Sequence, residues 1–203
     1  MGGYSDVSSI IANAGGIART ADFNKAGYAN HQVSYMCKIG LISRVRNGYY
    51  TMPLPQDDDA NEEEVIARLY PDGIICMDSA LFYYGYSDKT PLEWHLAFPR
   101  TVTRTRFDNV YPPVRWYMVK DDIFEMGKDI GAWGDTTLLI YNRERIICDC
   151  FKRRTELDSE TFSKAVNAYA ADDKKNLSRL SEYAKKLRVY GKVTEIMEVL
   201  LNG

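Results

Sequence analysis

An acidic run near residue 60 constrains the fold more than any other feature of this chain. The segment QDDDANEEE at 56–64 holds six acidic residues, no basic residue and no apolar residue larger than Ala60. Pro53 and Pro55 precede it and restrict the chain to extended or turn conformations. Like charges this close repel one another and stay solvated, so the run predicts a linker that leads into a helix. An acidic surface loop inside one domain is the alternative.

The charge of the chain changes sign around this run. Residues 1–54 hold five basic and two acidic residues, 55–150 hold ten basic and 18 acidic, and 151–203 hold 11 basic and eight acidic. The net charge of −2 therefore averages over parts of opposite sign and does not exclude a nucleic-acid binder. We expect a domain at 1–55, a linker at 56–64 and a second domain at 65–203.

Composition narrows the class of protein. A chain of 203 residues can bury a core without disulfides or metals, and 27% charged residues is an ordinary share. No stretch approaches the roughly 18 apolar residues of a membrane span. The opening MGGYSDVSS has no basic region followed by an apolar run, as a secretory signal would have. We expect a cytoplasmic protein that does not act at a membrane.

The cysteines do not predict a metal site. They form no C-x-x-C pair, and the closest two are separated by a single residue, too tight for a zinc knuckle. Only two histidines, His31 and His95, could complete such a site. We therefore expect no metal and no cofactor, and free thiols at Cys37, Cys76, Cys148 and Cys150.

Periodicity in the first 54 residues predicts three short helices and a hairpin. Ser5 or Ser8 can cap the first helix, which ends at Gly15-Gly16, and Thr20 can cap the second, at 21–26. The third helix is expected from about 29 to 39. Its inward stripe, Val33, Met36 and Cys37, has the spacing of a buried face.

After the third helix, Asn47-Gly48 between two alternating runs predicts a hairpin with a two-residue type I′ turn. Side chains alternate along a strand, so Arg44 and Arg46 should share a face. The order of elements is that of a winged helix-turn-helix, whose second motif helix enters the major groove of DNA.

The outer face of the third helix predicts DNA contacts. His31, Ser34, Tyr35 and Lys38 would present donors and acceptors to bases or phosphates, with Asn30 and Gln32 as candidate adenine readers. On the wing, Arg44, Arg46 and Asn47 would contact phosphates or the minor groove. Two alternatives remain open: the polar face is solvated or binds a protein, and Asn30 caps the helix in place of Ala29.

The rest of the chain predicts an α+β domain ending in helices. Strands are expected at 73–77, 93–98, 114–119 and 137–141. Helices should follow caps at Asp78 or Ser79, at Asn142 and at Asp158, with two more around 177–187 and 193–200.

We expect no enzyme. The only candidates for acid–base chemistry are Asp78, His95, Glu144 and Asp149. Capping, burial and helix-dipole stabilisation explain these residues without catalysis. The chain carries none of the motifs of hydrolases, P-loop proteins or zinc proteases.

Basic residues in the second domain form a candidate surface that would touch phosphate or RNA around Arg100, or continue the DNA track of the winged helix. A solvated face that balances the acidic middle is the alternative. The residues of this candidate surface are Arg100, Arg104, Arg106, Lys152, Arg153, Arg154, Lys185, Lys186 and Arg188.

Residues 15–53 resemble the N-terminal domain of the AbiEi antitoxins of bacterial abortive-infection systems. The matching features are Gly16, Thr20, the turn at Gly27, Lys38-x-Gly40-Leu41 and the wing ending Arg46-Asn47-Gly48-Tyr49-Tyr50. Residues 77–100 resemble the Ser-Ala-Leu helix of that family. Residues 143–151 resemble its Glu-Arg-x-x-x-Asp element, through Glu144, Arg145 and Asp149.

The resemblance implies a type IV antitoxin that defends against phage. The N-terminal winged helix would bind double-stranded DNA at the promoter of its own operon and repress it. The C-terminal domain would counteract a nucleotidyltransferase-like toxin without forming a stable complex. The alternative is a winged-helix transcriptional regulator whose C-terminal domain senses a ligand or partner and has no toxin.

Overall fold

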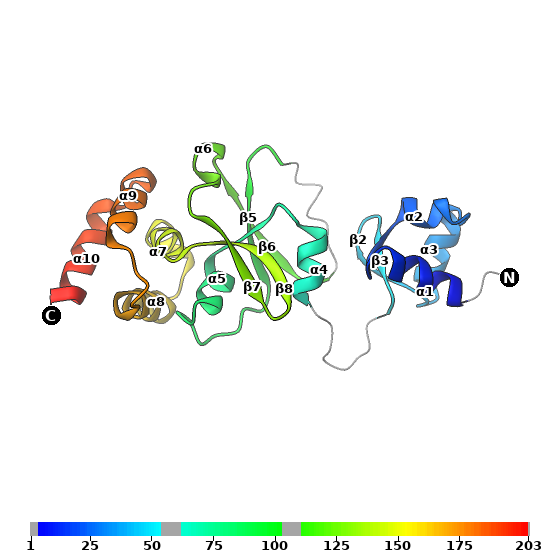
Figure 1. The fold of residues 1–203 in the computed structure, drawn as a ribbon, viewed down its shortest axis with the longest axis horizontal. Helices are drawn as coiled ribbons and strands as arrows, with labels where there is room; N and C mark the ends of the chain where they lie inside the picture. The colour runs from blue at the N-terminus through cyan, green and yellow to red at the C-terminus, as the bar shows by residue number, and fades with distance from the viewer. Residues whose placement is uncertain (1–3, 54–61, 103–110, 203) are drawn as a thin grey trace. The chain divides into compact units, whose positions relative to one another are not determined.

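The computed structural model describes residues 4–53, 62–102 and 111–202. The chain forms two compact units, one drawn from residues 1–70 and 103–114 and the other from 71–102 and 115–203. Both contain helices and antiparallel strands, so the class is α+β, as predicted (Figure 1). The candidate basic residues Arg104 and Arg106, and 56–61 of the acidic run, lie outside the described residues.

The first unit has the connectivity of a winged helix-turn-helix. Its three strands form an antiparallel sheet of order β1-β3-β2. Its elements are α1 (Tyr4–Asn13), β1 (Ala18–Arg19), α2 (Thr20–Lys25), α3 (Asn30–Lys38), β2 (Ser43–Arg46), β3 (Tyr49–Thr51) and α4 (Glu62–Leu69).

One apolar cluster holds the three N-terminal helices on this sheet. Val33 and Met36 of α3 are buried in it, as the predicted inward stripe requires, and Cys37 packs at its edge. Phe23 of α2 meets the ring of Tyr50 edge-on, with centroids 5.8 Å apart. The core thus fixes the rotation of α3, which decides the side chains that α3 shows to solvent.

The helix ends differ from the prediction in their caps. α1 begins at Tyr4, so both Ser5 and Ser8 lie inside the helix rather than before it. Thr20 is the first residue of α2 rather than its cap, because Arg19 precedes the helix and its N–H donates to Oδ2 of Asp22 at 2.8 Å. The predicted caps of the first two helices are therefore wrong.

The hairpin turn is not of type I′. That turn needs a positive φ at both central residues. Gly48 has φ of +77°, whereas Asn47 does not have a positive φ. A register shift between Arg44 and Arg46 also interrupts the β2–β3 ladder, so the sequence predicted the hairpin but not its turn.

The acidic run continues into α4. Glu62, Glu63 and Glu64 form the first turn of this helix. Carboxylates are favourable there because the N-terminal end of a helix carries partial positive charge.

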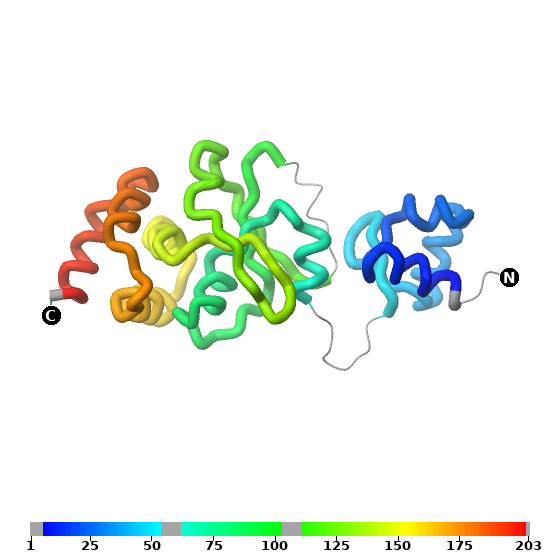
Figure 2. The backbone as a smooth tube through the Cα atoms, in the orientation of Figure 1, coloured from blue at the N-terminus to red at the C-terminus, as the bar shows by residue number. Residues whose placement is uncertain are grey.

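The second unit is a five-stranded mixed sheet of order β6-β5-β4-β8-β7 with helices (Figures 1 and 2). β4 is parallel to β8 and antiparallel to β5. The elements of the second unit are β4 (Ile74–Ile75), α5 (Met77–Tyr83), β5 (Trp94–Pro99), β6 (Val114–Val119), α6 (Asp121–Phe124), β7 (Lys128–Trp133), β8 (Thr136–Tyr141), α7 (Arg143–Lys152), a 3-10 helix (Arg154–Glu156), α8 (Ser159–Ala171), α9 (Leu177–Leu187) and α10 (Tyr190–Asn202).

Sequence reasoning found each of these strands except β7. The sequence KDIGAW lacks alternating apolar residues, and Ile130 is 70% exposed at this edge of the sheet. Asn142 and Asp158 cap α7 and α8 as predicted. Asp78 and Ser79 do not cap α5, because Cys76 occupies the capping position.

α7 is the central helix of the second unit and packs against α5, α8, α9 and α10. Its residue Arg145 is 1% exposed. The guanidinium donates to Oδ2 of Asp149 at 2.9 Å and to the carbonyl oxygens of Ile123 and Met126 at 2.6 and 2.7 Å. This buried charge is therefore paired and hydrogen-bonded, which offsets the cost of removing it from water.

Glu144, the neighbour of Arg145, is also buried and bonded inside the unit. Its Oε1 accepts from the backbone N–H of Asn176 at 2.9 Å and from the hydroxyl of Tyr169 at 3.3 Å. Glu144 and Arg145 thus connect α7 to the segments around it, and Asp149 holds Arg145 from within the helix.

Within the described residues, no helix is both long enough and apolar enough to cross a membrane. The four cysteines are free thiols, and Cys76, Cys148 and Cys150 are buried.

Gly127 tests the packing around Arg145. Its φ is +81°, and a Cβ there would lie 2.6 Å from Cβ of Arg145. Gly127→Ala should lower the free energy of unfolding by about 3 kcal/mol, from backbone strain plus overpacking, in urea denaturation. Gly191→Ala is the control, since this α10 position is open; it should stabilise by up to ~1 kcal/mol. Equal effects of the two substitutions would contradict the packing described.

Candidate nucleic-acid interface

The outward face of α3 carries the side chains that the helical period predicts. His31, Ser34, Tyr35 and Lys38 are all exposed, and Tyr35 is 61% exposed. The face has no carboxylate, so it offers hydrogen-bonding groups and one cation to an anionic partner. Ile39, which follows the last turn, is also exposed, at 54%.

The N-terminal end of α3 differs from the prediction. Ala29 is the residue before the helix, and Oε1 of Gln32 accepts from its backbone N–H at 2.8 Å. The side chain of Gln32 thus caps the N-terminal end of the helix, and only its amide NH2 group remains to bond a base. Asn30 is the first residue of α3 and is exposed, so its alternative role as the cap is wrong.

A groove of about 700 Å³ separates α3 from the wing. Ser34 and Lys38 line it from the helix, and Arg44 lines it from β2. Burial raises the pKa of the Cys37 thiol at the side of this groove, although Arg44 acts in the opposite direction. The structure therefore gathers three of the predicted contact residues around one concave surface beside a neutral thiol.

The two wing arginines do not share a face as predicted. The register shift sets Arg44 opposite Tyr50 and Arg46 opposite Tyr49, and neighbouring side chains of a strand point to opposite faces. The guanidinium carbon of Arg44 lies 5.9 Å from the ring centroid of Tyr50. That of Arg46 lies 3.9 Å from the centroid of Tyr49 and 5.5 Å from that of Tyr70. Asn47, at the turn, is exposed.

Sequence reasoning missed Arg19 as part of this wing. Arg19 of β1 pairs with Tyr49 of the central strand, and its guanidinium carbon lies 5.6 Å from that ring centroid. Tyr49 is thus flanked by a cation from each neighbouring strand. Two arginines facing one tyrosine could be found only with the strand register in hand, since Arg19 lies 30 positions before Tyr49 in the sequence.

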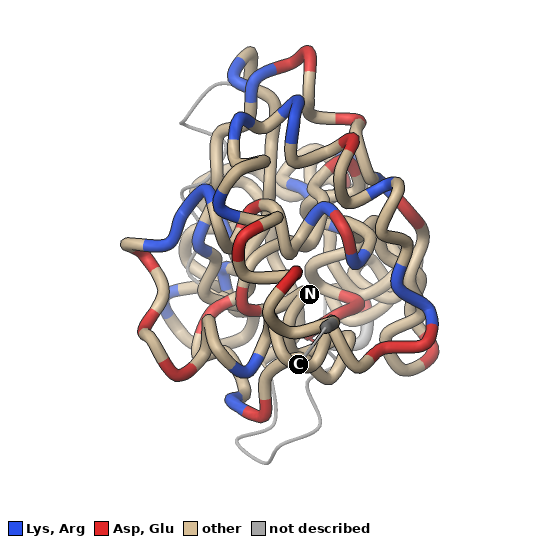
Figure 3. Tube along the Cα trace, turned by 90° about the vertical axis from the view of Figure 1, so that its left-hand side faces the viewer, with Lys and Arg blue, Asp and Glu red and all other residues tan. Residues whose placement is uncertain are grey.

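The candidate basic residues of the second unit separate into two groups. Five of them line one pocket, described below as the basic pocket: Arg100, Lys152, Arg153, Lys186 and Arg188. Arg154 lies outside it and donates to Oγ of Ser159, and Lys185 lies over the ring of Tyr190. Figure 3 shows basic and acidic positions interspersed over the C-terminal helices, so a single positive face does not extend across them.

The residues considered for catalysis do not form one site. Glu144 and Asp149 bond within the second unit as described. His95 is buried, with Nε2 3.9 Å from Oδ2 of Asp78 and Nδ1 3.3 Å from the hydroxyl of Tyr117. Oδ1 of Asp78 is buried and has no hydrogen-bond partner. Burial raises the pKa of Asp78 and lowers that of His95 to about 4.

Comparison with known proteins shows a shared fold. No protein-family model and no curated protein matches the chain. The crystal structure of the RV2827C protein from Mycobacterium tuberculosis is similar, with a TM-score of 0.65 and 14% sequence identity. The match covers 98% of this chain and 80% of that chain. At this identity the likeness extends to the fold alone.

His95 predicts how stability depends on pH. Its folded pKa of about 4 lies below the unfolded value near 6.5, so the neutral ring stabilises the fold above pH 6.5. That contribution, about 3 kcal/mol at most, is lost as pH falls from 6.5 to 4. The difference in unfolding free energy between wild type and His95→Gln should shrink over this range in urea titrations. His31→Gln controls for losing a histidine as such, and a difference that is constant with pH would contradict the prediction.

Proposed function

We propose that this chain is a sequence-specific binder of double-stranded DNA that represses its own operon. The observation that carries the proposal is the exposed face of α3, free of carboxylates, beside a wing that bears Arg44 and Arg46. A helix of this kind fits the major groove, and a wing fits the adjacent backbone or minor groove.

The positions of the side chains support a division of roles. Ser34 and Tyr35 lie in the middle of the exposed face, where they would meet base edges, with His31 and Asn30 near the helix start. Lys38 and Arg44 border the groove between helix and wing, where a phosphate would lie between them. Arg46 is held against Tyr49, so it would reach DNA with less loss of side-chain freedom.

The role of the second unit is proposed from the resemblance to AbiEi antitoxins. In that proposal the chain is a cytoplasmic antitoxin that counteracts a nucleotidyltransferase-like toxin without a stable complex. A second candidate is a regulator whose second unit senses a ligand. The basic pocket supports this candidate, because it is concave and charged.

Lys38→Ala with Arg44→Ala tests DNA binding. Loss of two phosphate contacts should weaken binding to every duplex and lower the slope of log affinity against log salt by about 2. Fluorescence anisotropy on the upstream region of the operon and on scrambled DNA measures both. Ser34→Ala should instead reduce the preference for the operator over scrambled DNA.

Lys174→Ala with Lys192→Ala is the matched control, since it removes two exposed cations of the second unit. It should leave both the affinity and the salt slope unchanged. Equal binding of wild type to operator and scrambled duplexes would refute sequence-specific repression.

The antitoxin role predicts that the two activities separate. The full chain carrying Lys38→Ala and Arg44→Ala should fail to repress its promoter but still relieve growth arrest by the neighbouring toxin. Growth curves from co-expression under an independent promoter measure the relief. Absence of relief by wild type would reject the antitoxin role, and relief lost only in the double variant would assign it to DNA binding.

A further inference from the structure

The basic pocket is a cavity of about 460 Å³ within the second unit. It is lined by the start of α5, by β5, β6 and α6, by α7 and by the end of α9, all of which lie in that unit. Cys76, Tyr141, Arg145 and Asp149 form a buried floor, and exposed cations form its rim. The volume is that of an ordinary small-molecule site, about 300–1,000 Å³.

The charges of the pocket do not balance. Seven cations line it, but only two carboxylates, those of Asp122 and Asp149. Asp149 already forms an ion pair with Arg145. Arg153 and Lys186 pair with acids outside the lining. The other four cations form no ion pair with any residue that the structure describes: Arg100, Lys120, Lys152 and Arg188.

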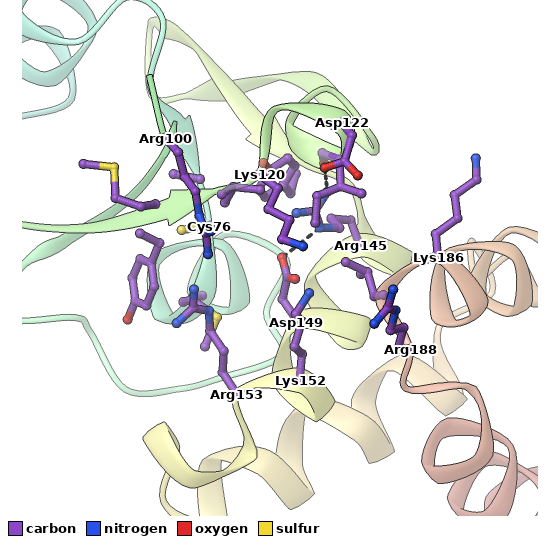
Figure 4. Close-up of a pocket in the computed structure, with 18 residues that line it drawn as sticks. Cys76, Arg100, Lys120, Asp122, Arg145, Asp149, Lys152, Arg153, Lys186 and Arg188 are labelled. Atoms are coloured by element: carbon purple, nitrogen blue, oxygen red, sulfur yellow. Dashed lines mark hydrogen bonds and ion pairs between the residues drawn. The ribbon is translucent and has the colours of Figure 1, made fainter. Parts of the chain in front are cut away.

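These cations converge from separate elements. In Figure 4 the side chains of Arg100 and Arg153 extend toward one another near Cys76. Burial lowers the pKa of Lys152, the carboxylate of Asp149 raises it, and Arg145, Arg153 and Lys120 lower it again. Like charges brought this close repel one another unless an anion lies between them.

The backbone around the pocket is also unusual. Met77 and Arg188, with φ of +44° and +62°, are the two described non-glycine residues in the left-handed region, and both line the cavity. Arg188 ends α9 in an αL cap, which is a common way for a helix to end, so the strained position is Met77 at the start of α5.

Some of the lining residues are apolar or aromatic. Val119, Ile123 and Leu187 contribute aliphatic surface, and Tyr117 contributes an aromatic ring. A bare inorganic anion would leave this surface unused. A ligand with an anionic end and a flat, less polar end would use both parts of the lining.

We propose that the basic pocket binds a nucleoside phosphate, with its phosphates among Arg100, Lys120, Lys152 and Arg188. The nucleoside would contact the apolar and aromatic lining residues. Arg145, fixed by Asp149 and by two carbonyl oxygens, holds the floor beneath the phosphates. A volume of about 460 Å³ suits a single nucleotide, whereas a nucleic-acid strand would need an open, continuous track. The proposal does not depend on DNA binding by the first unit.

Isothermal titration of the full chain tests the proposal. ADP, GDP, CDP and UDP are titrated separately, with adenosine and inorganic phosphate for comparison. At least one diphosphate should bind at one site per chain, and adenosine and phosphate should each bind at least about tenfold more weakly. The double variant Arg100→Gln, Lys152→Gln should bind that diphosphate about tenfold more weakly, or weaker still.

Lys174→Gln with Lys192→Gln, outside the pocket, should keep the wild-type affinity. Thermal unfolding without ligand verifies that both double variants fold. The proposal is overturned if no diphosphate binds, if phosphate alone binds as tightly, or if the pocket variant binds as wild type does. Lys38→Ala with Arg44→Ala should still bind the diphosphate, so failure of DNA binding leaves this result distinguishable.

Discussion

The second unit depends on one buried charge. Arg145 is enclosed by Asp149, by the carbonyl oxygens of Ile123 and Met126, and by the ring of Tyr141, 4.2 Å from its guanidinium carbon. A buried guanidinium that loses a partner is strongly destabilising, so these segments are held in one arrangement. Because Arg145 is fixed there, a side chain at position 127 would clash with it, so that position is a glycine. Arg145 also forms part of the floor of the basic pocket.

The resemblance to AbiEi antitoxins pointed to Glu144, Arg145 and Asp149 as a shared element. In this fold the three side chains bond mainly within the unit and are almost completely buried. Their first role is to join α7 to its neighbours. The residues free to meet a partner are instead cations around them: Arg100 after β5, Lys120 after β6, Arg188 at the end of α9 and Lys152 at the end of α7.

Features set by local periodicity were predictable, and features set by register or by distant segments were not. The buried and exposed stripes of α3 follow from a 3.6-residue period, and Asn142 and Asp158 were identified as caps from residue type. The hairpin turn, the pairing of Arg46 with Tyr49 and the capping role of Gln32 depend on register or on a side-chain rotamer. The basic pocket joins residues from 76 to 188, which no local pattern connects.

The hydrogen bond from the N–H of Ala29 to Gln32 limits how α3 could diverge if it reads DNA as proposed. Gln32 lies beside the exposed face of α3 and also satisfies an otherwise unpaired backbone donor. Exchange of this residue to suit another operator would therefore also weaken the helix. Positions 31, 34 and 35 carry no such duty, so new specificities are accessible there at little structural cost. Divergent operators should then be matched by changes at those three positions while residue 32 keeps an acceptor.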